Sequence, residues 1–426
     1  MKDKLENLRK RSIFAGVMKY TLYAPERLRG TVLLPASKSI SNRALILHGL
    51  SGGNMDEIDN LSDCDDTQVM IRAFREQPGV VDIMAAGTAM RFLTAYLSVT
   101  PGERVITGTK RMRQRPIAVL VDALRSLGAS IEYVEKEGFP PLRITGKRLK
   151  GGVIELPGNV SSQYISALLM VAPMWTEGLI IQLTGEVISR PYIELTIQLM
   201  REFGAGVGWN TDTCLQVAPT RYHPVRYSVE SDWSAASYCY EMLALSRGDG
   251  ELFLPRLHAD SFQGDCKVAA LFEKLGVYTS YEPEGVRLTK TGAVTKCMEY
   301  DFVNQPDLAQ TFVVTCALLN IPFRFTGLQS LKIKETDRIV ALRCEMEKLG
   351  YSIGEENDSV LYWNGERCPA HLEDAIATYQ DHRMAMAFAP AVLRLPFIQI
   401  ENPSVVSKSY PAYWKELGKL GFRIEE

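Results

Sequence analysis

Hydrophobic and polar residues follow a pattern that recurs six times along this chain. A strand-like run is followed by a short polar loop with a helix-capping residue, and then by apolar residues at helical spacing, as in residues 34–47. After a first interval of 49 residues, the capping residues follow one another at intervals of 71 to 75 residues. The predicted capping residues are Ser37 or Ser39, Thr88, Ser161, Asp232, Asp307 and Asp381.

A second pattern has the same period: an amphipathic helix that closes at a glycine and is followed by a short strand. Each glycine lies 40 to 44 residues after its capping residue. Two independent patterns with one period predict six repeats of βαβαββ type. The first repeat is expected to be short, because only 9 residues separate its glycine from the next capping residue, whereas later gaps are 28 to 33 residues. The closing glycines are Gly79, Gly128, Gly204, Gly276, Gly350 and Gly421.

The first polar loop, within residues 34–43, places Lys38 and several hydroxyl groups between a strand and a helix. Free backbone N–H groups and the positive end of the helix dipole favour an anion at such a position. Taken alone, the loop is equally typical of a capped surface helix with a solvated lysine. Its recurrence along the chain favours an anion site.

The composition describes a soluble globular protein. The chain has 426 residues, 46% of them hydrophobic, and a net charge of -2. This length suits two or more domains, and the charge gives no sign of nucleic-acid binding. No apolar run approaches the roughly 18 to 20 residues that cross a bilayer. Residues 1–17 lack the apolar core of a signal peptide, so we expect an N-terminal extension or an upstream start there.

The eight cysteines and five histidines do not form metal-binding motifs. The cysteines are scattered singly without CxxC spacing, and several lie inside apolar helix patterns. This favours buried free thiols in a reducing cytoplasm over disulfides or zinc. No two histidines stand at metal-ligand spacing. We therefore expect a cytoplasmic protein without a metal.

Eight cations stand at transitions from loop to helix, although the protein is slightly acidic. If equivalent ends of similar repeats face one place, these side chains converge there and suit substrates with several negative charges. Blander interpretations are a surface ion-pair run over residues 332–338 and a plain N-cap role for Asp307. A Walker loop and a G-x-G-x-x-G motif are both missing, which disfavours nucleotide chemistry. The cations are Lys38, Arg43, Arg91, Arg115, Lys334, Arg338, Arg383 and Lys408.

Six motifs, in this order, closely resemble those of the 5-enolpyruvylshikimate-3-phosphate synthase family. They are residues 35–43, 86–91, 114–116, 161–163, 334–338 and 381–386. The resemblance runs from about residue 18 to the C-terminus. It implies a two-domain, inside-out α/β barrel with three βαβαββ repeats per domain and helix N-termini directed into the cleft. One domain would comprise residues 37–230, and the other residues 18–36 with 231–426.

The resemblance also implies a reaction. The enolpyruvyl group of phosphoenolpyruvate would move to the 5-hydroxyl of 3-phosphoshikimate through a tetrahedral adduct, and inorganic phosphate would leave. Asp307 would accept the hydroxyl proton, Glu335 would protonate the vinyl carbon, and Lys38 and Lys334 would act with them electrostatically. We expect no cofactor or metal, no nucleic-acid or membrane partner, and a monomeric chain that binds only small-molecule substrates.

The substrate contacts carry over from the same resemblance, position by position. For 3-phosphoshikimate they would be Lys38, Ser39, Arg43, Ser161, Ser162, Gln163, Ser189, Asp307, Ser330 and Lys334. For phosphoenolpyruvate they would be Lys38, Gly87, Arg115, Gln163, Arg338, Arg383 and Lys408.

Four positions depart from the family pattern, namely Ala36, Ala85, Phe92 and Ser330. Ala85 and Phe92 flank Gly87, so we expect them to reshape the phosphoenolpyruvate pocket and its response to the inhibitor glyphosate. Ser330 replaces an asparagine, which weakens the expectation for that one contact. None of the four removes a predicted acid, base or essential cation.

Two other functions stay open at this point. UDP-N-acetylglucosamine enolpyruvyltransferase shares the fold and the donor. It typically has a Lys-Asn pair where this chain has Lys38 and Ser39, and a reactive cysteine that the cluster near Arg115 lacks. A non-catalytic anion-binding scaffold would bind phosphorylated acids but would release no phosphate when both substrates are present.

Overall fold

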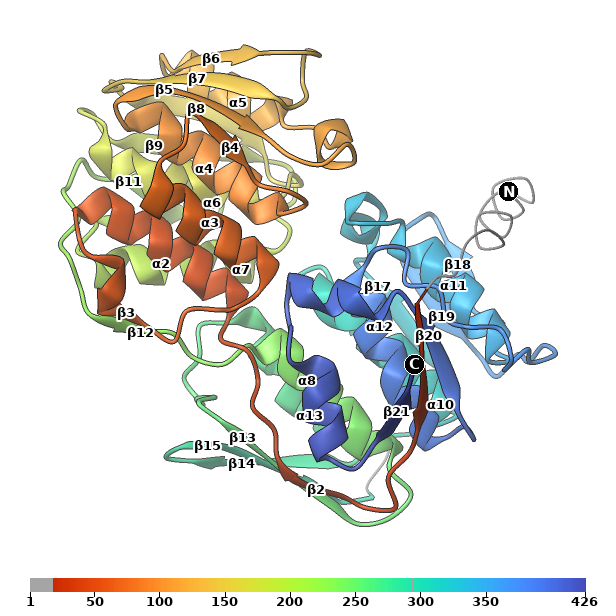
Figure 1. Cartoon of the computed structure of the whole chain (residues 1–426). Helices are drawn as coiled ribbons and strands as arrows, with labels where there is room; N and C mark the ends of the chain where they lie inside the picture. Colours follow the sequence, from red (N-terminus) through yellow and green to blue (C-terminus); the bar gives the residue numbers. More distant parts are fainter. Residues whose placement is uncertain (1–17, 293–294) are drawn as a thin grey trace.

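A computed structural model describes residues 18–292 and 295–426, and these residues form two hydrophobic cores. One core is built from residues between Ala36 and Val229. The other combines Leu22, Leu28 and Val32 with residues beyond Trp233. We call residues 36–229 the first lobe and the remaining described residues the second lobe (Figure 1). The two cores support the domain boundaries expected above, which we retain as a proposal; residues 1–17 lie outside the described residues.

The first lobe contains two four-stranded sheets and one two-stranded pair, with strand orders β4-β5-β7-β6, β10-β11-β9-β8 and β12-β3. Its strands are β3 (Ile58–Asp59), β4 (Val80–Asp82), β5 (Gly102–Thr107), β6 (Ser130–Tyr133), β7 (Leu142–Gly146), β8 (Gly152–Pro157), β9 (Leu179–Thr184), β10 (Val207–Thr211), β11 (Cys214–Val217) and β12 (Tyr227–Ser228). Its helices are α2 (Lys38–Ser51), α3 (Asp65–Glu76), α4 (Gly87–Val99), α5 (Ala118–Ser126), α6 (Ser162–Val171) and α7 (Arg190–Glu202).

The second lobe contains two four-stranded sheets and one three-stranded sheet, with orders β14-β15-β13-β2, β16-β17-β19-β18 and β20-β1-β21. Its strands are β1 (Lys19–Tyr23), β2 (Leu28–Thr31), β13 (Gly250–Pro255), β14 (Val277–Glu282), β15 (Gly285–Lys290), β16 (Met298–Asp301), β17 (Phe323–Thr326), β18 (Gly354–Glu356), β19 (Val360–Trp363), β20 (Ile398–Glu401) and β21 (Arg423–Glu425). Its helices are α8 (Trp233–Leu245), α9 (Val268–Glu273), α10 (Ala309–Leu318), α11 (Arg338–Lys348), α12 (His382–Phe388) and α13 (Tyr413–Lys419).

The sheets show the expected repeat. In each four-stranded sheet one pair of strands is parallel and the closing strands pair antiparallel. In three of these sheets a single helix connects the parallel strands, as α4 connects β4 and β5, whereas the whole first lobe lies between β2 and β13. The first repeat is shortened as predicted, since its sheet is only the β12-β3 pair. The N-terminal strands complete sheets of the second lobe, because β1 pairs with β20 and β21 while β2 pairs with β13.

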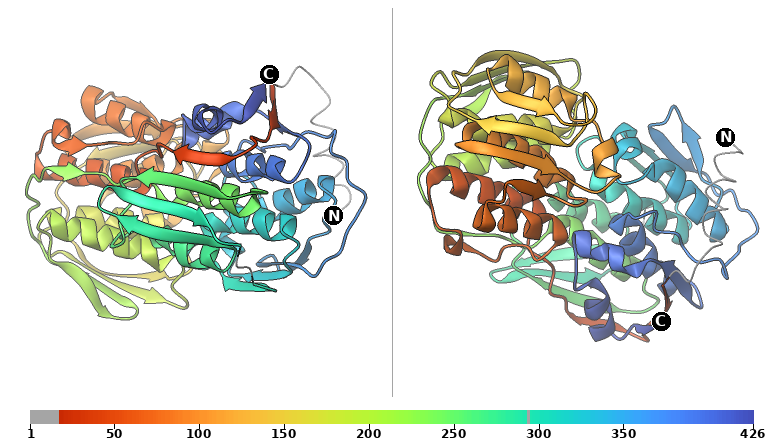
Figure 2. Two further views of the ribbon diagram at one scale, coloured as in Figure 1. Left: turned by 90° about the horizontal axis from the view of Figure 1, so that it is seen from below. Right: turned by 45° about the horizontal axis from the view of Figure 1, so that its top comes forward.

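Apolar helices fill the centre of each lobe, and the sheets lie outside them (Figure 2). All ten residues of α10 and all seven of α12 are buried, and α8 is buried at every position but one. A helix that is hydrophobic on all sides is typical of a protein interior. This is the inside-out arrangement that the resemblance implies. Within the described residues, every helix is too short or too polar to cross a bilayer.

Most predicted helix ends are confirmed. Ser37, Ser161, Asp232 and Asp381 each accept a hydrogen bond from a backbone N–H in the first turn of the helix that follows. Five of the six glycines adopt a left-handed φ between 83° and 97°, which glycine reaches without strain. The prediction fails at Gly79, since Gln77 with a φ of 43° ends helix α3 instead.

Two capping predictions are wrong. Helix α4 begins at Gly87 after Ala86, so Thr88 lies inside its first turn. Helix α10 follows Leu308, and Asp307 lies in a short 3-10 helix without capping the helix that follows. In both cases tertiary contacts, described below, determine where the side chain points.

Two chain segments cross between the lobes side by side. Ala36 forms a β-bridge with Ser231, the Ser37 N–H donates to the Glu230 carbonyl at 2.8 Å, and the Asp232 N–H donates to the Pro35 carbonyl at 2.9 Å. The crossing therefore places the start of α2 next to the start of α8. Helix starts from both lobes are brought toward one region in this way (Figure 1).

Candidate active site

A cavity of about 280 Å³ lies between the lobes, at the starts of α2, α4, α6 and α7 of the first lobe and of α10, α11 and α12 of the second. It is lined by all but one of the predicted site residues. These are Lys38, Ser39, Arg43, Gly87, Arg115, Ser161, Ser162, Gln163, Ser189, Asp307, Ser330, Lys334, Glu335, Arg338 and Arg383. Lys408 does not line it, and its ammonium donates to the Gln380 carbonyl at 2.6 Å.

Neutral donors form one part of the first-lobe wall, at the starts of α6 and α7. Ser161 caps α6, and the Gln163 side-chain amide donates to the Thr88 hydroxyl at 3.1 Å. Ser189 precedes α7 in a left-handed conformation, with a φ of 54°. Hydroxyl, amide and helix N-terminal N–H groups together bind a phosphate without burying further charge.

Arg43 is a buried cation of this wall, with a relative exposure of 3%. It donates to the hydroxyls of Thr196 at 2.7 Å and Ser166 at 3.3 Å and to two backbone carbonyls, and no carboxylate within the described residues pairs with it. Burial lowers the pKa of Arg43 to about 10, so the guanidinium stays charged near neutral pH. Its positive charge is therefore available to a substrate anion.

Phe92 lies beside Arg43, with the guanidinium carbon 5.2 Å from the ring centre. The sequence suggested that Phe92 flanks Gly87 and reshapes the phosphoenolpyruvate pocket. The Phe92 side chain is instead fully buried and packs on Arg43. The resulting cation–π contact stabilises the guanidinium in its buried position. Phe92 thus belongs to the support of Arg43.

Gly87 and Arg115 touch at the start of α4. A Cβ atom added at Gly87 would lie 2.6 Å from Nη1 of Arg115, so the glycine makes room for the guanidinium. Arg91 holds the two segments together, because it donates to the Gly87 carbonyl and to the Pro116 carbonyl, each at 3.2 Å. This arrangement positions Arg115 at a helix N-terminus.

Asp307 is the carboxylate at the centre of the second-lobe wall. Its oxygens lie 2.8 Å from Nη2 of Arg383, 3.2 Å from Nη1 of Arg338 and 3.6 Å from Nζ of Lys334. Burial alone would raise the pKa of Asp307, but these cations outweigh it and hold the pKa well below 3.8. The plain N-cap interpretation of Asp307 is therefore wrong.

Arg338 joins three carboxylates while only 1% exposed. It donates to Asp381 at 2.7 Å and to Glu335 at 2.9 Å, in addition to Asp307. Although burial acts in the opposite direction, Arg338 holds the pKa of Glu335 well below 4.5. Asp381 also caps α12 by accepting from the Arg383 N–H at 2.9 Å. The blander interpretation of residues 332–338 as a surface ion-pair run fails for Glu335 and Arg338.

The cavity is also lined by residues that the sequence did not assign to the site, among them Asp66, Tyr192 and His382. Asp66 lies 3.7 Å from the Lys38 ammonium and raises the pKa of Lys38, although burial acts to lower it. The Tyr192 hydroxyl donates to Asp307 at 3.5 Å and so links the lobes. A signal for Asp66 was present, because residues 63–66 hold three carboxylates directly before or in the first turn of a predicted helix.

His382 is buried, and neither ring nitrogen has a hydrogen-bond partner. Burial and the neighbouring Lys38 and Arg383 lower the pKa of His382 well below 6.5, so the imidazole is neutral. Its place in the motif of residues 381–386 was visible in the sequence, but nothing there indicated that it faces the cavity.

The cavity thus combines fixed cations, two ionised carboxylates and neutral donors. Such a set binds small molecules with several negative charges and moves protons between hydroxyl or carbon acids and carboxylates. Across residues 18–292 and 295–426, no cluster of three or more histidines, cysteines or carboxylates is arranged to hold a metal ion.

The sequence matches one protein family along nearly its whole length. The matching family is described as EPSP synthase (3-phosphoshikimate 1-carboxyvinyltransferase), and it covers residues 22–78 and 75–417. A 3-phosphoshikimate 1-carboxyvinyltransferase of Bacteroides fragilis is 61% identical over 408 residues, covering 96% of this chain and 99% of the relative. One from Bordetella pertussis is 38% identical over 437 residues, covering 94% and 97%.

Solved structures agree on the fold. EPSP synthase from Acinetobacter baumannii superposes with a TM-score of 0.77 at 21% identity, covering 96% of this chain and 100% of that one. The enolpyruvyl transferase NikO from Streptomyces tendae superposes with a TM-score of 0.70 at 17% identity, covering 96% and 99%.

Proposed function

The chain belongs to the EPSP synthase family and is a 3-phosphoshikimate 1-carboxyvinyltransferase of the shikimate pathway, and we propose that the cavity between the lobes is its active site. The enolpyruvyl group of phosphoenolpyruvate passes to the 5-hydroxyl of 3-phosphoshikimate, and phosphate leaves. One observation carries the proposal: Asp307 and the cations of both lobes line the same cavity.

In this proposal the first-lobe wall binds 3-phosphoshikimate. Ser161, Ser162, Gln163 and Ser189 hold the 3-phosphate with neutral donors at the starts of α6 and α7. Arg43, which lacks a carboxylate partner among the described residues, pairs with the ring carboxylate next to Ser39. An ion pair with a buried and otherwise unpaired guanidinium is strong because the site excludes water.

Phosphoenolpyruvate lies between the lobes. Arg115 beside Gly87 holds one end of it from the first lobe, while Arg338 and Arg383 hold the other from the second. Lys38 lines the same cavity and contacts both substrates. Lys408 joins the site if it exchanges the Gln380 carbonyl for the donor's phosphate.

The two carboxylates exchange protons with the substrates. Asp307 takes the proton of the 5-hydroxyl as the oxygen bonds to C2 of phosphoenolpyruvate, and Glu335 gives a proton to C3, which forms the tetrahedral adduct. Glu335, now ionised, takes a proton back from the new methyl group as the C–O bond to phosphate breaks, which gives the enol ether and releases phosphate. Bound substrate anions compete for Arg383 and Arg338, which raises the pKa of Asp307 and Glu335 toward the values that proton transfer requires.

The deciding measurement is phosphate release with phosphoenolpyruvate and either 3-phosphoshikimate or UDP-N-acetylglucosamine as acceptor. We expect release with 3-phosphoshikimate only. Release with the nucleotide sugar instead would assign the chain to the sister activity, and binding without release would leave a scaffold.

Asp307→Ala tests the assigned base. It should lose about 10²- to 10⁴-fold in kcat, as is typical for removal of a general base, while both substrates still bind. Asp212→Ala is the matched control, since the Asp212 side chain is 99% exposed and its ion pair with Arg190 spans 3.9 Å. An active Asp307→Ala enzyme would remove this residue from the mechanism.

We also propose that the chain is a monomer and acts in the cytoplasm. Light scattering on the purified chain should give one chain mass, 47.6 kDa. A mass near twice that value would replace the monomer by a dimer without affecting the assignment of the reaction.

A further inference from the structure

A second cavity, of about 520 Å³, lies in the second lobe at the opposite ends of the helices that start at the active site. It is found where α8 ends at Leu245 and α10 ends at Leu318. Helix α10 starts at the active site and has 10 residues, so its length separates this cavity from the catalytic one by about 15 Å at 1.5 Å per residue. Its walls are Ser246, Arg247, Lys290, Leu318, Asn320, Tyr351, Arg394 and Leu395.

Positive side chains dominate these walls. Arg247, Lys290 and Arg394 line the cavity, and the Arg367 guanidinium lies 3.8 Å from the centre of the Tyr351 ring and donates to Asn320. Within the described residues none of these four cations forms an ion pair with a carboxylate. The whole chain carries a net charge of -2, so this excess of positive charge is local.

The cations repel one another. Burial and the nearby Arg247 lower the pKa of Arg394, and burial and Arg394 lower the pKa of Lys290. Asp249 acts on Lys290 only from beyond ion-pair distance. A bound anion would relieve this repulsion, as an opposite charge in a partly buried site does.

Helix dipoles explain only part of the cluster. The carbonyls at a helix C-terminus attract cations, and Lys290 serves this purpose, since its ammonium donates to the carbonyls of Ala244 and Ser246. Arg394 has no such role: its Nε atom is buried without a hydrogen-bond partner. A buried donor that lacks an acceptor destabilises the fold, and an oxyanion in the cavity would supply that acceptor.

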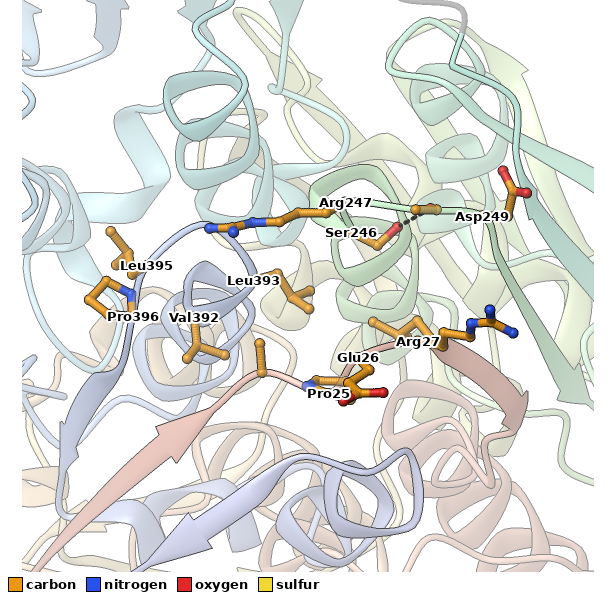
Figure 3. A pocket seen from close by; sticks show the side chains of 13 residues that line it. Pro25, Glu26, Arg27, Ser246, Arg247, Asp249, Val392, Leu393, Leu395 and Pro396 are labelled. Atoms are coloured by element: carbon orange, nitrogen blue, oxygen red, sulfur yellow. Dashed lines mark hydrogen bonds between the residues drawn. The ribbon is translucent and has the colours of Figure 1, made fainter.

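An adjoining cavity of about 290 Å³ extends the space (Figure 3). The two share Ser246, Arg247 and Leu395. In Figure 3 the Arg247 side chain extends across the adjoining cavity toward Leu395 and Pro396. The adjoining cavity has an apolar wall, formed by Val392, Leu393 and Pro396. A ligand can therefore place an oxyanion among the cations and an uncharged part beside these residues.

We propose that these cavities form a second ligand site, separate from the active site, that binds a small molecule carrying a phosphate or several carboxylates. Arg247 and Arg394 both donate hydrogen bonds to the oxyanion, and Lys290 adds a third positive charge to the same cavity. The fixed fork of donors on each arginine suits either group.

Protection of Arg247 from an arginine-specific dicarbonyl reagent, read by mass spectrometry, tests the site. Arg247 is exposed, so it reacts in the free chain. The probes are pyrophosphate and citrate at millimolar concentration, and either one should slow modification of Arg247 about fivefold or more if it fills the site with an affinity below its concentration. Protection by pyrophosphate alone identifies a phosphate site, and protection by citrate alone a carboxylate site.

Two variants show whether the cluster holds the probe. Arg394→Gln and Lys290→Gln should each raise the probe concentration needed for half-maximal protection of Arg247 by about tenfold, which is the effect of losing one charge-assisted hydrogen bond. Arg221→Gln, on an exposed residue of the first lobe, is the control and should change nothing. Phosphate release by each variant should equal that of the parent, which shows that it is folded. No protection by either probe, or protection that persists in both cluster variants, overturns the proposal.

Discussion

The two lobes contribute unlike halves to one cavity. Arg43 in the first lobe and Arg338 in the second are both almost fully buried, at 3% and 1% exposure. Arg43 donates only to hydroxyl and carbonyl oxygens, whereas Arg338 donates to three carboxylates. In the first-lobe half the charge of Arg43 is thus not neutralised by a carboxylate, while in the second-lobe half the charge of Arg338 is neutralised by ion pairs.

This difference assigns the halves different tasks. Unpaired cations and neutral donors bind anions strongly, because no internal partner has to be displaced. Carboxylates fixed by several arginines keep their position and stay ionised, which suits proton transfer at a set place. The contrast predicts that similar substitutions in the two lobes have effects of opposite sign on the ligand-free protein.

The largest effect is expected from Arg338→Met. Removing this guanidinium leaves Asp307, Glu335 and Asp381 buried without it, and loss of one partner of a buried ion pair costs about 3 to 5 kcal/mol. Urea unfolding of the ligand-free chain should show this loss, and turnover should disappear. Arg343→Met, in the same helix but half-exposed and paired only with Glu355 and a carbonyl, should cost about 1 kcal/mol or less. Equal losses would mean that the carboxylates do not depend on Arg338.

The second expected effect depends on pH and concerns Asp265, a buried carboxyl behind Asp307. Burial and Asp307 raise the pKa of Asp265 from 3.8 to about 7, with a hydrogen bond from Ser234 acting against them. Between these two values the folded chain keeps a proton that the unfolded chain loses, so stability falls as pH rises from about 4 to about 7.

Asp265→Asn removes this proton, so its stability should vary less over that range. A three-unit shift corresponds to about 4 kcal/mol at most. Between pH 4 and pH 8 the free energy of unfolding should fall more in the parent than in the variant. We expect this difference to be about half of the maximum, because the surroundings relax. Thermal unfolding at both pH values measures the difference. Identical pH profiles of variant and parent would show that Asp265 is ionised in the folded chain.

A smaller effect, of opposite sign to that at Arg338, is expected for Arg43→Met. Replacing a buried charge without a carboxylate partner by an apolar side chain is neutral or stabilising in the ligand-free protein. Binding of 3-phosphoshikimate should weaken by about 10- to 100-fold, the worth of a charged hydrogen-bonding partner. Calorimetry and urea unfolding give the two quantities. A marked loss of ligand-free stability would show that the lobes do not differ in this way.

The smallest effect is expected at Gly87. In Gly87→Ala the new methyl group meets the end of the flexible Arg115 side chain at 2.6 Å, so the guanidinium shifts and the fold is kept. The KM for phosphoenolpyruvate should rise by up to about tenfold, or about 1.4 kcal/mol, while kcat changes little. Gly79→Ala is the control, since nothing lies within 4 Å of a Cβ atom there. An unchanged KM would show that Arg115 does not contact phosphoenolpyruvate.

The repeat and most helix ends were predictable from the sequence because they depend on local chemistry. The cap at Ser161 and the closing glycine at Gly204 each need only a few neighbouring residues. The same reasoning failed at Thr88 and Asp307, where contacts from elsewhere in the chain decide. Asp307 is held by Arg338, 31 residues away, and by Arg383, 76 residues away.

The residues that line the cavity were largely predictable from the family motifs, but their pairing was not. No motif shows that Asp66 meets Lys38, or that the Tyr192 hydroxyl crosses to Asp307, 115 residues away. Phe92 was placed near Gly87 because it is close in sequence, and the structure places its ring on Arg43. Spacing along a chain identifies the residues that gather at a helix start, while the partners across the cleft depend on how the two lobes dock.

The pairing of β1 with β20 and β21 has a consequence for synthesis on the ribosome. Leu22 pairs with Ile398, which is synthesised 376 positions later. At about 5 to 20 residues per second, the ribosome needs about 20 to 75 s to reach it. The first lobe can fold long before, since its core is complete at Val229. The nascent chain therefore carries one finished half and one apolar leading strand without its neighbours, and a chaperone that shields this strand would raise the yield of active enzyme.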